Sequence, residues 1–247
     1  MVMREITSVQ SLLEALDEDN DGYTGAVWYR GQANIDWALL PGYVRLINPP
    51  SEATLLKRFK QSAAMLIERH PGESFDWLFV MQHYGVPTRL LDWSESPLVG
   101  LYFAVEGYAA GQEADAALWL LRPSELNKHA HIHNKDEEGY IPSFDDPELE
   151  AYSVDSLAQN KRVQLLPVAT IATRNNARIQ AQLGVFTIHH HENIPIENIG
   201  NSSHVVKYKI PNHAKPTILK QLRILGFGRF QMFPELASVG QIIKEGV

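Results

Sequence analysis

Residues 83–105 read HYGVPTRLLDWSESPLVGLYFAV, and this stretch contains the clearest signals for where helices end and begin. Gly85 suits the left-handed cap that ends a helical pattern over residues 75–82. Ser96 followed by Pro97 marks a new helix, because proline at the first helical position loses no hydrogen bond. Apolar residues then recur at helical spacing as far as Val105. The stretch therefore predicts two helices joined by a polar connection, where functional groups tend to lie.

Outward from this stretch, helical patterns are interspersed with short strand patterns. Helices are expected over residues 8–17, where Thr7 and Gln10 suggest a capping box, from Ser51, from Lys215 and after Pro234. Runs of apolar or β-branched residues are typical of strands. These runs cover residues 27–30, 116–121, 163–170, 185–189 and 205–210. No linker or internal repeat divides the chain, so we predict a single α+β domain over residues 1–247, with a central mixed or antiparallel sheet flanked by helices.

Residues 124–160 differ from the rest of the chain. They are polar, acidic and irregular, and they include the segment HAHIHNKDEEG. Long connections of this kind commonly form insertions or mobile segments. We predict an insertion or a flap here.

Composition removes several classes of protein from consideration. The chain has no cysteine, so disulfides, thiolate metal sites and a cysteine nucleophile are excluded. Its net charge of −7 disfavours broad adhesion to nucleic acid or to anionic lipid, since both need a basic face. No export signal and no membrane-length apolar run is visible. We expect a cytoplasmic protein without a membrane partner.

Histidines form two clusters, one alternating over residues 129–133 and one consecutive over residues 189–191. Imidazoles can hold zinc, yet no carboxylate sits at a familiar ligand interval. The sequence therefore predicts no metal. The phosphate-binding loop, the nucleophile elbow and the dinucleotide-binding glycine pattern are also absent from the sequence.

Three segments concentrate apolar anchors and hydrogen-bonding groups. They are residues 28–32 (WYRGQ), 83–94 (HYGVPTRLLDWS) and 178–186 (RIQAQLGVF). In the first, a strand is expected to deliver Arg30 at its carboxyl end. A purely structural interpretation stays open, in which Arg89 pairs with Asp92 and Arg30 holds a buried carboxylate. Five aromatic residues are expected in the core: Trp28, Tyr29, Trp93, Tyr102 and Phe103.

These segments resemble the FRG domain family. Tyr29-Arg30-Gly31 is similar to the family's F-R-G signature, with tyrosine replacing phenylalanine. Residues 83–106 resemble its longest motif, and the pattern R-x-x-x-Q-x-G-x-F at residues 178–186 resembles its third. The resemblance covers about residues 22–240. It implies a domain found in bacterial and phage proteins, but it assigns little function.

A remoter resemblance is to ADP-ribosyltransferases, which order an NAD site as a first-strand arginine, a middle strand leading into a helix, and a late glutamate. It implies a split sheet, NAD as substrate, and catalytic roles for Arg30, Ser94 and Gln182. It also implies aromatic stacking on nicotinamide by Tyr84, Trp93 or Tyr102. The binding residues implied are Gly31, Gln32, His83, Tyr84, Thr88, Arg89, Asp92, Trp93, Tyr102, Arg178 and Gln180.

This chain departs from that pattern at Gln182, which stands where the glutamate is expected. A neutral amide stabilises an oxocarbenium ion less than a carboxylate does, so Asp92 or Glu95 could be recruited instead. The resemblance implies transfer of ADP-ribose to a protein or nucleic acid, or hydrolysis of NAD, by a toxin or phage-defence effector. Two alternatives stay open. One is a non-catalytic module in which Arg30, Arg89 and Arg178 bind a nucleotide, a nucleic acid or a partner protein. The other is a hydrolase or nuclease that uses His83 with Asp92.

Overall fold

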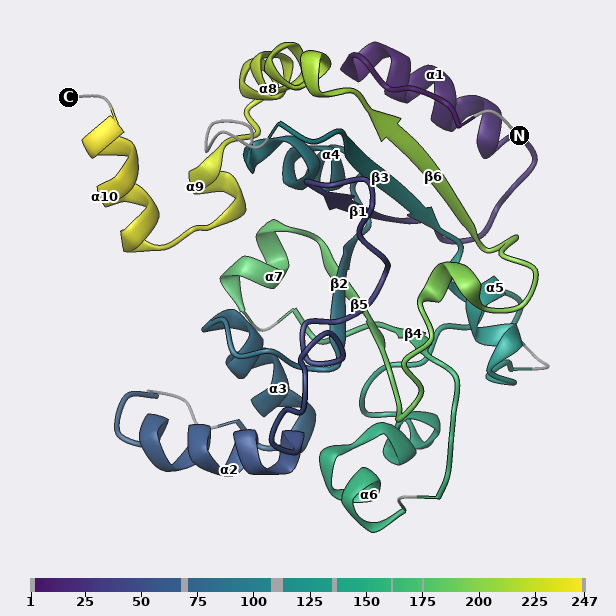
Figure 1. The fold of residues 1–247 in the computed structure, drawn as a ribbon, viewed down its shortest axis with the longest axis vertical. Helices are drawn as coiled ribbons and strands as arrows, with labels where there is room; N and C mark the ends of the chain where they lie inside the picture. Colours follow the sequence, from purple (N-terminus) through teal and green to yellow (C-terminus); the bar gives the residue numbers. More distant parts are fainter. Residues whose placement is uncertain are drawn as a thin grey trace.

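The computed structural model describes residues 3–67, 71–107, 113–134, 137–160, 162–174 and 176–245. Within these residues one antiparallel sheet has the order β4-β5-β2-β1-β3-β6 (Figure 1). Its strands are β1 (Trp28–Gln32), β2 (Leu90–Ser94), β3 (Ala116–Leu121), β4 (Val168–Thr170), β5 (Gly184–Ile188) and β6 (Val205–Ile210). The predicted α+β domain with a central sheet is confirmed.

The sheet is close to being divided at its centre. Strands β1 and β2 pair at a single position, Tyr29 with Ser94. By contrast, every residue of β2 pairs with β5, and every residue of β1 pairs with β3. The two halves, β4-β5-β2 and β1-β3-β6, therefore meet at a narrow contact, which we call the seam.

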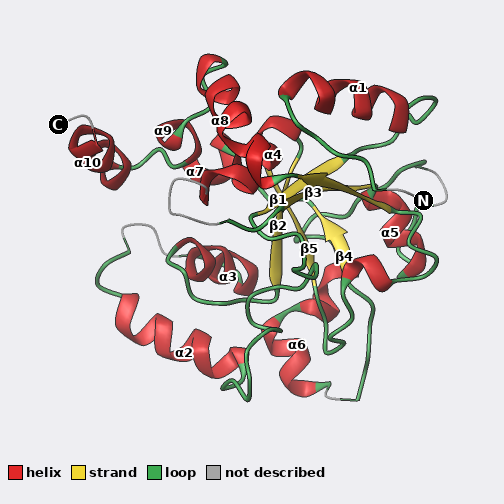
Figure 2. Ribbon diagram, turned by 45° about the horizontal axis from the view of Figure 1, so that its top comes forward, coloured by secondary structure: helices red, strands yellow, loops and turns green. Residues whose placement is uncertain are grey.

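Helices surround this sheet (Figure 2). They are α1 (Val9–Asp19), α2 (Glu52–Ala63), α3 (Ser74–His83), α4 (Pro97–Val105), α5 (Pro123–His129), α6 (Val154–Gln159), α7 (Ala177–Ala181), α8 (Lys215–Ile224), α9 (Arg229–Met232) and α10 (Leu236–Glu245). Helices α1, α4 and α8 lie beside the β1-β3-β6 half, whereas α2 and α3 lie toward the other end of the molecule (Figure 1). None of the described helices is long and apolar enough to cross a membrane.

Helix α4 packs unusually closely on β1. Ser96 caps it by accepting from the Val99 amide, with Pro97 in the first turn, as the sequence predicts. A Cβ atom added to Gly31 would lie 2.0 Å from the Gly100 carbonyl oxygen, so only glycine permits this approach. The F-R-G-like signature therefore combines a packing residue with an arginine.

Three apolar clusters make up the core. One joins α1, α4 and α8 to the β1-β3-β6 half, and another joins α3 to β5 and residues 144–154. The third gathers Trp28, Trp93 and Trp119 with aliphatic neighbours. Of the five aromatic residues expected in the core, Trp28, Tyr29, Trp93 and Tyr102 are buried, while Phe103 is partly buried.

Three sequence predictions need correction. Arg30 lies in the middle of β1, opposite Trp119, and not at the carboxyl end. The strand expected over residues 163–170 is formed only by its last three residues. The helix cap near residue 8 is made by Ser8 with Ser11, in place of Thr7 with Gln10.

The segment 124–160 is built into the domain. Apart from residues 135 and 136, which lie outside the described residues, it carries most of α5, a 3-10 turn over Pro147–Tyr152 and α6. Phe144, Leu149 and Tyr152 are buried in the second core cluster. These apolar side chains anchor the described part of the segment in the core, and the insertion or flap stays a prediction.

Candidate functional site

A cavity of about 390 Å³ lies at the seam between the two halves of the sheet. Strand β1 contributes Arg30, β2 contributes Ser94, and the end of α7 contributes Gln182. The other predicted residues that line it are Gly31, Gln32, Asp92, Trp93 and Arg178. The structure thus brings together, at one cavity, the three side chains that the sequence singled out as catalytic.

Arg30 spans the seam. Its Nη1 donates to the Asp92 carbonyl oxygen at 2.6 Å, which ties β1 to β2 beside their single residue pair. Its Nε is buried and has no hydrogen-bond partner among the described residues. Burial lowers the pKa of the guanidinium, the neighbouring Asp92 opposes that shift, and Arg45 adds to it. A partly buried cation with an unused donor favours an anionic ligand.

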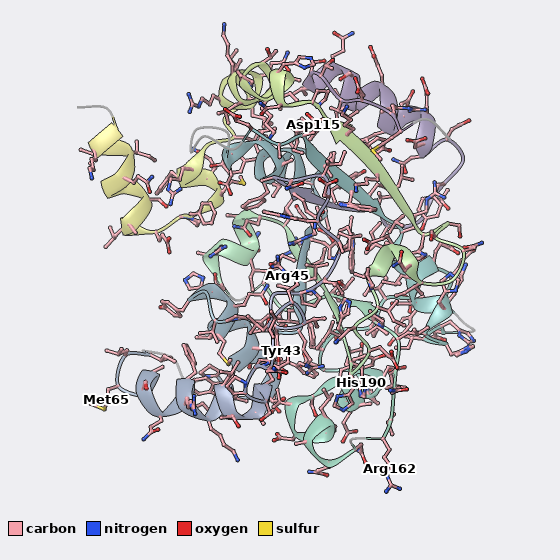
Figure 3. All side chains as sticks on the ribbon, viewed as in Figure 1. Tyr43, Arg45, Met65, Asp115, Arg162 and His190 are labelled. Carbon is pink, nitrogen blue, oxygen red and sulfur yellow. The ribbon has the colours of Figure 1, made fainter. Side chains whose placement is uncertain are left out.

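Two further guanidiniums, those of Arg45 and Arg178, line the same cavity. Arg178 lies over the Phe233 ring at 4.7 Å from its centroid. Among the residues that the structure describes, neither of these arginines nor Arg30 comes within ion-pair distance of a carboxylate. Figure 3 shows Arg45 near the middle of the molecule. Sequence reasoning missed Arg45, because it lies in an irregular segment without a pattern.

Two carboxylates line the cavity as well, those of Asp92 and Glu106. Asp92 Oδ1 accepts from Gln82 Nε2 at 2.6 Å. Burial raises the pKa of Glu106, whereas a hydrogen bond from Tyr102 and the charge of Arg229 oppose the shift. Three arginines therefore face two carboxylates, and the cavity has an excess of positive charge although the chain is acidic.

Ser94 and Gln182 are held by their own contacts. Ser94 Oγ donates to the Gln182 carbonyl oxygen at 2.6 Å and accepts from the Ser96 amide at 3.0 Å. Gln182 Nε2 donates to the Met232 carbonyl oxygen at 2.9 Å. The Ser94 hydroxyl proton is thus already used, so this residue positions the loop before β5 instead of offering a free donor to a ligand.

Several predicted binding residues are structural. Arg89 is buried and donates from Nε to Glu52 at 2.7 Å, from Nη1 to the His189 carbonyl and from Nη2 to the Tyr152 carbonyl. Thr88 is buried and donates to the side chain of Gln82. Neither residue lines the cavity at the seam, and these contacts give both side chains a role in packing. Their binding roles stay predictions.

Of the three aromatic residues predicted to stack on a ligand, Trp93 lines the cavity, whereas Tyr84 and Tyr102 do not. Tyr84 is 68% exposed and lies against Phe59 and His83. The Trp93 indole is buried in the core and donates to Thr187 at 3.0 Å. Tyr102 is buried in the core as well.

The aromatic residues that line the cavity are Tyr29, Trp37, Trp93 and Phe103, and of these Tyr29, Trp37 and Phe103 were not predicted to bind a ligand. Gln32 lines the cavity too, but its amide is held by Trp119 and by the Ala38 carbonyl. Gln180 is exposed on α7 and lies outside the lining. Glu95, considered as a replacement for the missing glutamate, forms an ion pair with Arg174 and lies outside the lining as well.

A smaller cavity of about 120 Å³ adjoins the first. Asp92, Arg178 and Gln182 line both cavities, and His83 lines only the smaller one. His83 Nε2 lies 3.9 Å from Glu235 Oε2, while the Asp92 carboxylate is bonded by Gln82. The His83–Asp92 pair that a hydrolase would use is therefore replaced by two other pairings.

His129 of the first cluster packs edge-on against His204, and the second cluster makes separate contacts. Ring nitrogens of His189 and of His204, a residue outside both clusters, bond backbone carbonyl oxygens, and His190 packs edge-on against Tyr152. Among the described residues no three His, Asp or Glu side chains gather in a way that could hold a metal ion.

In a comparison with protein families, residues 25–113 fit the model of the FRG domain. This segment holds the Tyr29-Arg30-Gly31 signature and the stretch 83–105, so the resemblance seen in the sequence is confirmed there. The third motif, residues 178–186, lies beyond the matched segment. No curated protein and no solved structure matches the chain.

Proposed function

We propose that this chain, whose residues 25–113 match the FRG domain, binds NAD at the seam and cleaves its nicotinamide–ribose bond. The ADP-ribosyl group would pass to a macromolecule or to water. One observation carries the proposal: Arg30, Ser94 and Gln182 converge on one cavity from β1, β2 and the approach to β5. These are the positions that the resemblance to ADP-ribosyltransferases singles out, and the nearly divided sheet agrees with that resemblance.

The charge of the cavity suits a dinucleotide. Guanidiniums bind phosphate oxygens through parallel hydrogen bonds, and Arg30, Arg45 and Arg178 are without carboxylate partners among the described residues. The volume of about 390 Å³ lies within the usual range for ligand sites. Trp37 and Phe103 supply aromatic surface for the nicotinamide ring.

Bond cleavage would place positive charge on the ribose as neutral nicotinamide leaves with the bonding electron pair. Asp92 is the carboxylate on β2 next to Arg30, and it lines both cavities. We expect Asp92 to supply the negative charge that Gln182 cannot, while the Gln182 amide helps hold the ribose. The hydrogen bond from Gln82 fixes the direction of the Asp92 carboxylate.

The second candidate is a nucleotide-binding module without turnover. Gln182 favours it, because the residue expected to stabilise the reacting sugar is neutral here. The module and the enzyme share the same binding site. They differ only in whether nicotinamide is released from NAD.

The test is to incubate the purified chain with NAD and cell lysate and to measure nicotinamide and ADP-ribosylated products by mass spectrometry. Arg30→Ala should weaken NAD binding by about 10- to 100-fold, since hydrogen bonds to a charged group contribute about 1.5–3 kcal/mol. Arg162→Ala is the matched control, because this exposed arginine lies at the periphery (Figure 3).

The outcomes separate the two candidates. Nicotinamide release by the wild type and the control, with loss in Arg30→Ala, supports the enzyme. A thermal shift with NAD that depends on Arg30, without release, supports the module. Neither release nor a thermal shift with NAD rejects the NAD site altogether.

A further inference from the structure

The smaller cavity joins the candidate NAD site from the side of α3 and α7. Asp92, Trp93, Arg178 and Gln182 line both cavities, whereas Gln82 and His83 line the smaller one alone. At about 120 Å³ it has room for one small functional group, not for a second nucleotide. A group that enters here reaches the same carboxylate that faces the larger cavity.

His83 lines this smaller cavity from the end of α3. The side chain is 23% exposed, so it is accessible from solvent. The charged groups around it are Arg178 from α7, Glu235 ahead of α10 and Asp92 across the cavity from β2, and the Tyr84 ring lies 4.8 Å away. Glu235 lies close enough to stabilise a proton on the ring.

We propose that the acceptor of the ADP-ribosyl group enters through the smaller cavity, that it is a hydroxyl group, and that His83 takes its proton. This inference rests on the proposed NAD chemistry. The bond between ribose C1′ and the nicotinamide nitrogen breaks, and its electron pair leaves with nicotinamide. The acceptor oxygen forms the new bond to C1′, and its proton moves to the imidazole, where Glu235 balances the positive charge.

The lining favours a hydroxyl over the other acceptors. A protonated lysine or arginine would meet the Arg178 guanidinium, which lines the cavity without a carboxylate partner among the described residues. A carboxylate acceptor has no proton to give, so it would make no use of a base. Burial and the charge of Arg178 lower the pKa of His83, and the carboxylate of Glu235 opposes the shift. The imidazole is therefore neutral near pH 7 and able to accept a proton.

The test compares nicotinamide release by the wild type, His83→Ala and His133→Ala, the last being an exposed histidine outside both cavities. We expect His83→Ala to be slower by about 100-fold or more. Its thermal shift with NAD should equal that of the wild type. Added imidazole should restore part of the rate, since it can occupy the vacated space.

The pH profile and the products give two more readouts. The rate of the wild type should fall as pH drops through a value below 6.5, and this inflection should vanish in His83→Ala. Free ADP-ribose identifies water as the hydroxyl source, whereas a label on serine or threonine that resists neutral hydroxylamine identifies a polypeptide.

Each contrary result has a distinct meaning. An unchanged rate in His83→Ala rejects the role of His83 and leaves the NAD site standing. A label on arginine, lysine or a carboxylate rejects the hydroxyl acceptor. If the wild type releases no nicotinamide, the proposed function fails and this inference fails with it.

Discussion

Replacing Arg89 with methionine should destabilise the whole domain. The Arg89 and Glu52 side chains are only 3% and 6% exposed, and Arg89 also holds two backbone carbonyls. Its removal leaves the Glu52 carboxylate buried without its partner. Breaking a buried pair in this way costs about 3–5 kcal/mol. For a chain of this size, that lowers the melting temperature by roughly 6–20 °C.

The assay is urea unfolding followed by circular dichroism, with Arg162→Met as the exposed control. The control should stay within about 0.5 kcal/mol of the wild type. Adding Glu52→Leu to Arg89→Met should recover part of the loss, because it removes the orphaned charge. A loss under about 1 kcal/mol for Arg89→Met alone would refute the structural role assigned to this arginine and return it to the list of candidate ligand-binding residues.

Gly31→Ala should lower the free energy of unfolding by at least about 2 kcal/mol, because the new Cβ would lie 2.0 Å from a backbone oxygen of α4. The control is Gly240→Ala, whose new Cβ would have no atom within 4 Å. In the same urea assay the control should be neutral or slightly stabilising. His189 and His190 have their pKa lowered to about 4, in each case chiefly by burial. Because the unfolded chain binds protons that the folded chain does not, stability should fall as pH drops from 6.5 toward 4, by about 2 kcal/mol per histidine at pH 5. Urea unfolding at pH 7.5 and 5.0 checks this, and an unchanged pH dependence in His189→Asn and His190→Asn would contradict it.

Local patterns in the sequence were sufficient for much of the fold. The strands at Ala116–Leu121 and Val205–Ile210 were predicted at their observed bounds, since each is a continuous apolar or β-branched run. The start of α4 was equally clear, because Ser96 and Pro97 act within one turn. Short-range chemistry of this kind needs no knowledge of the tertiary structure.

Long-range contacts explain what the sequence could not supply. Arg89 has the chemistry of a ligand-binding residue, and the approach of Glu52 and of two backbone carbonyls, all at least 37 residues away along the chain, gives it a structural role. The buried side chains of segment 124–160, such as Phe144, are scattered among acidic residues, so no local pattern showed that they pack in the core. Arg45 reaches the cavity from a loop without periodicity. In each case the partner is distant in sequence, so no local pattern could reveal it.

The seam also limits how far the chain can be shortened while the remaining fragment still folds by itself. Residues 25–113 contain β1 and β2, which touch each other at one residue pair, and exclude β3 and β5, to which each is bonded along its full length. A fragment trimmed to those bounds would expose both long edges of each strand and the apolar faces that the missing strands cover. Strands of the two halves alternate along the chain. The smallest fragment that contains both halves therefore extends from β1 through β6, residues 28–210.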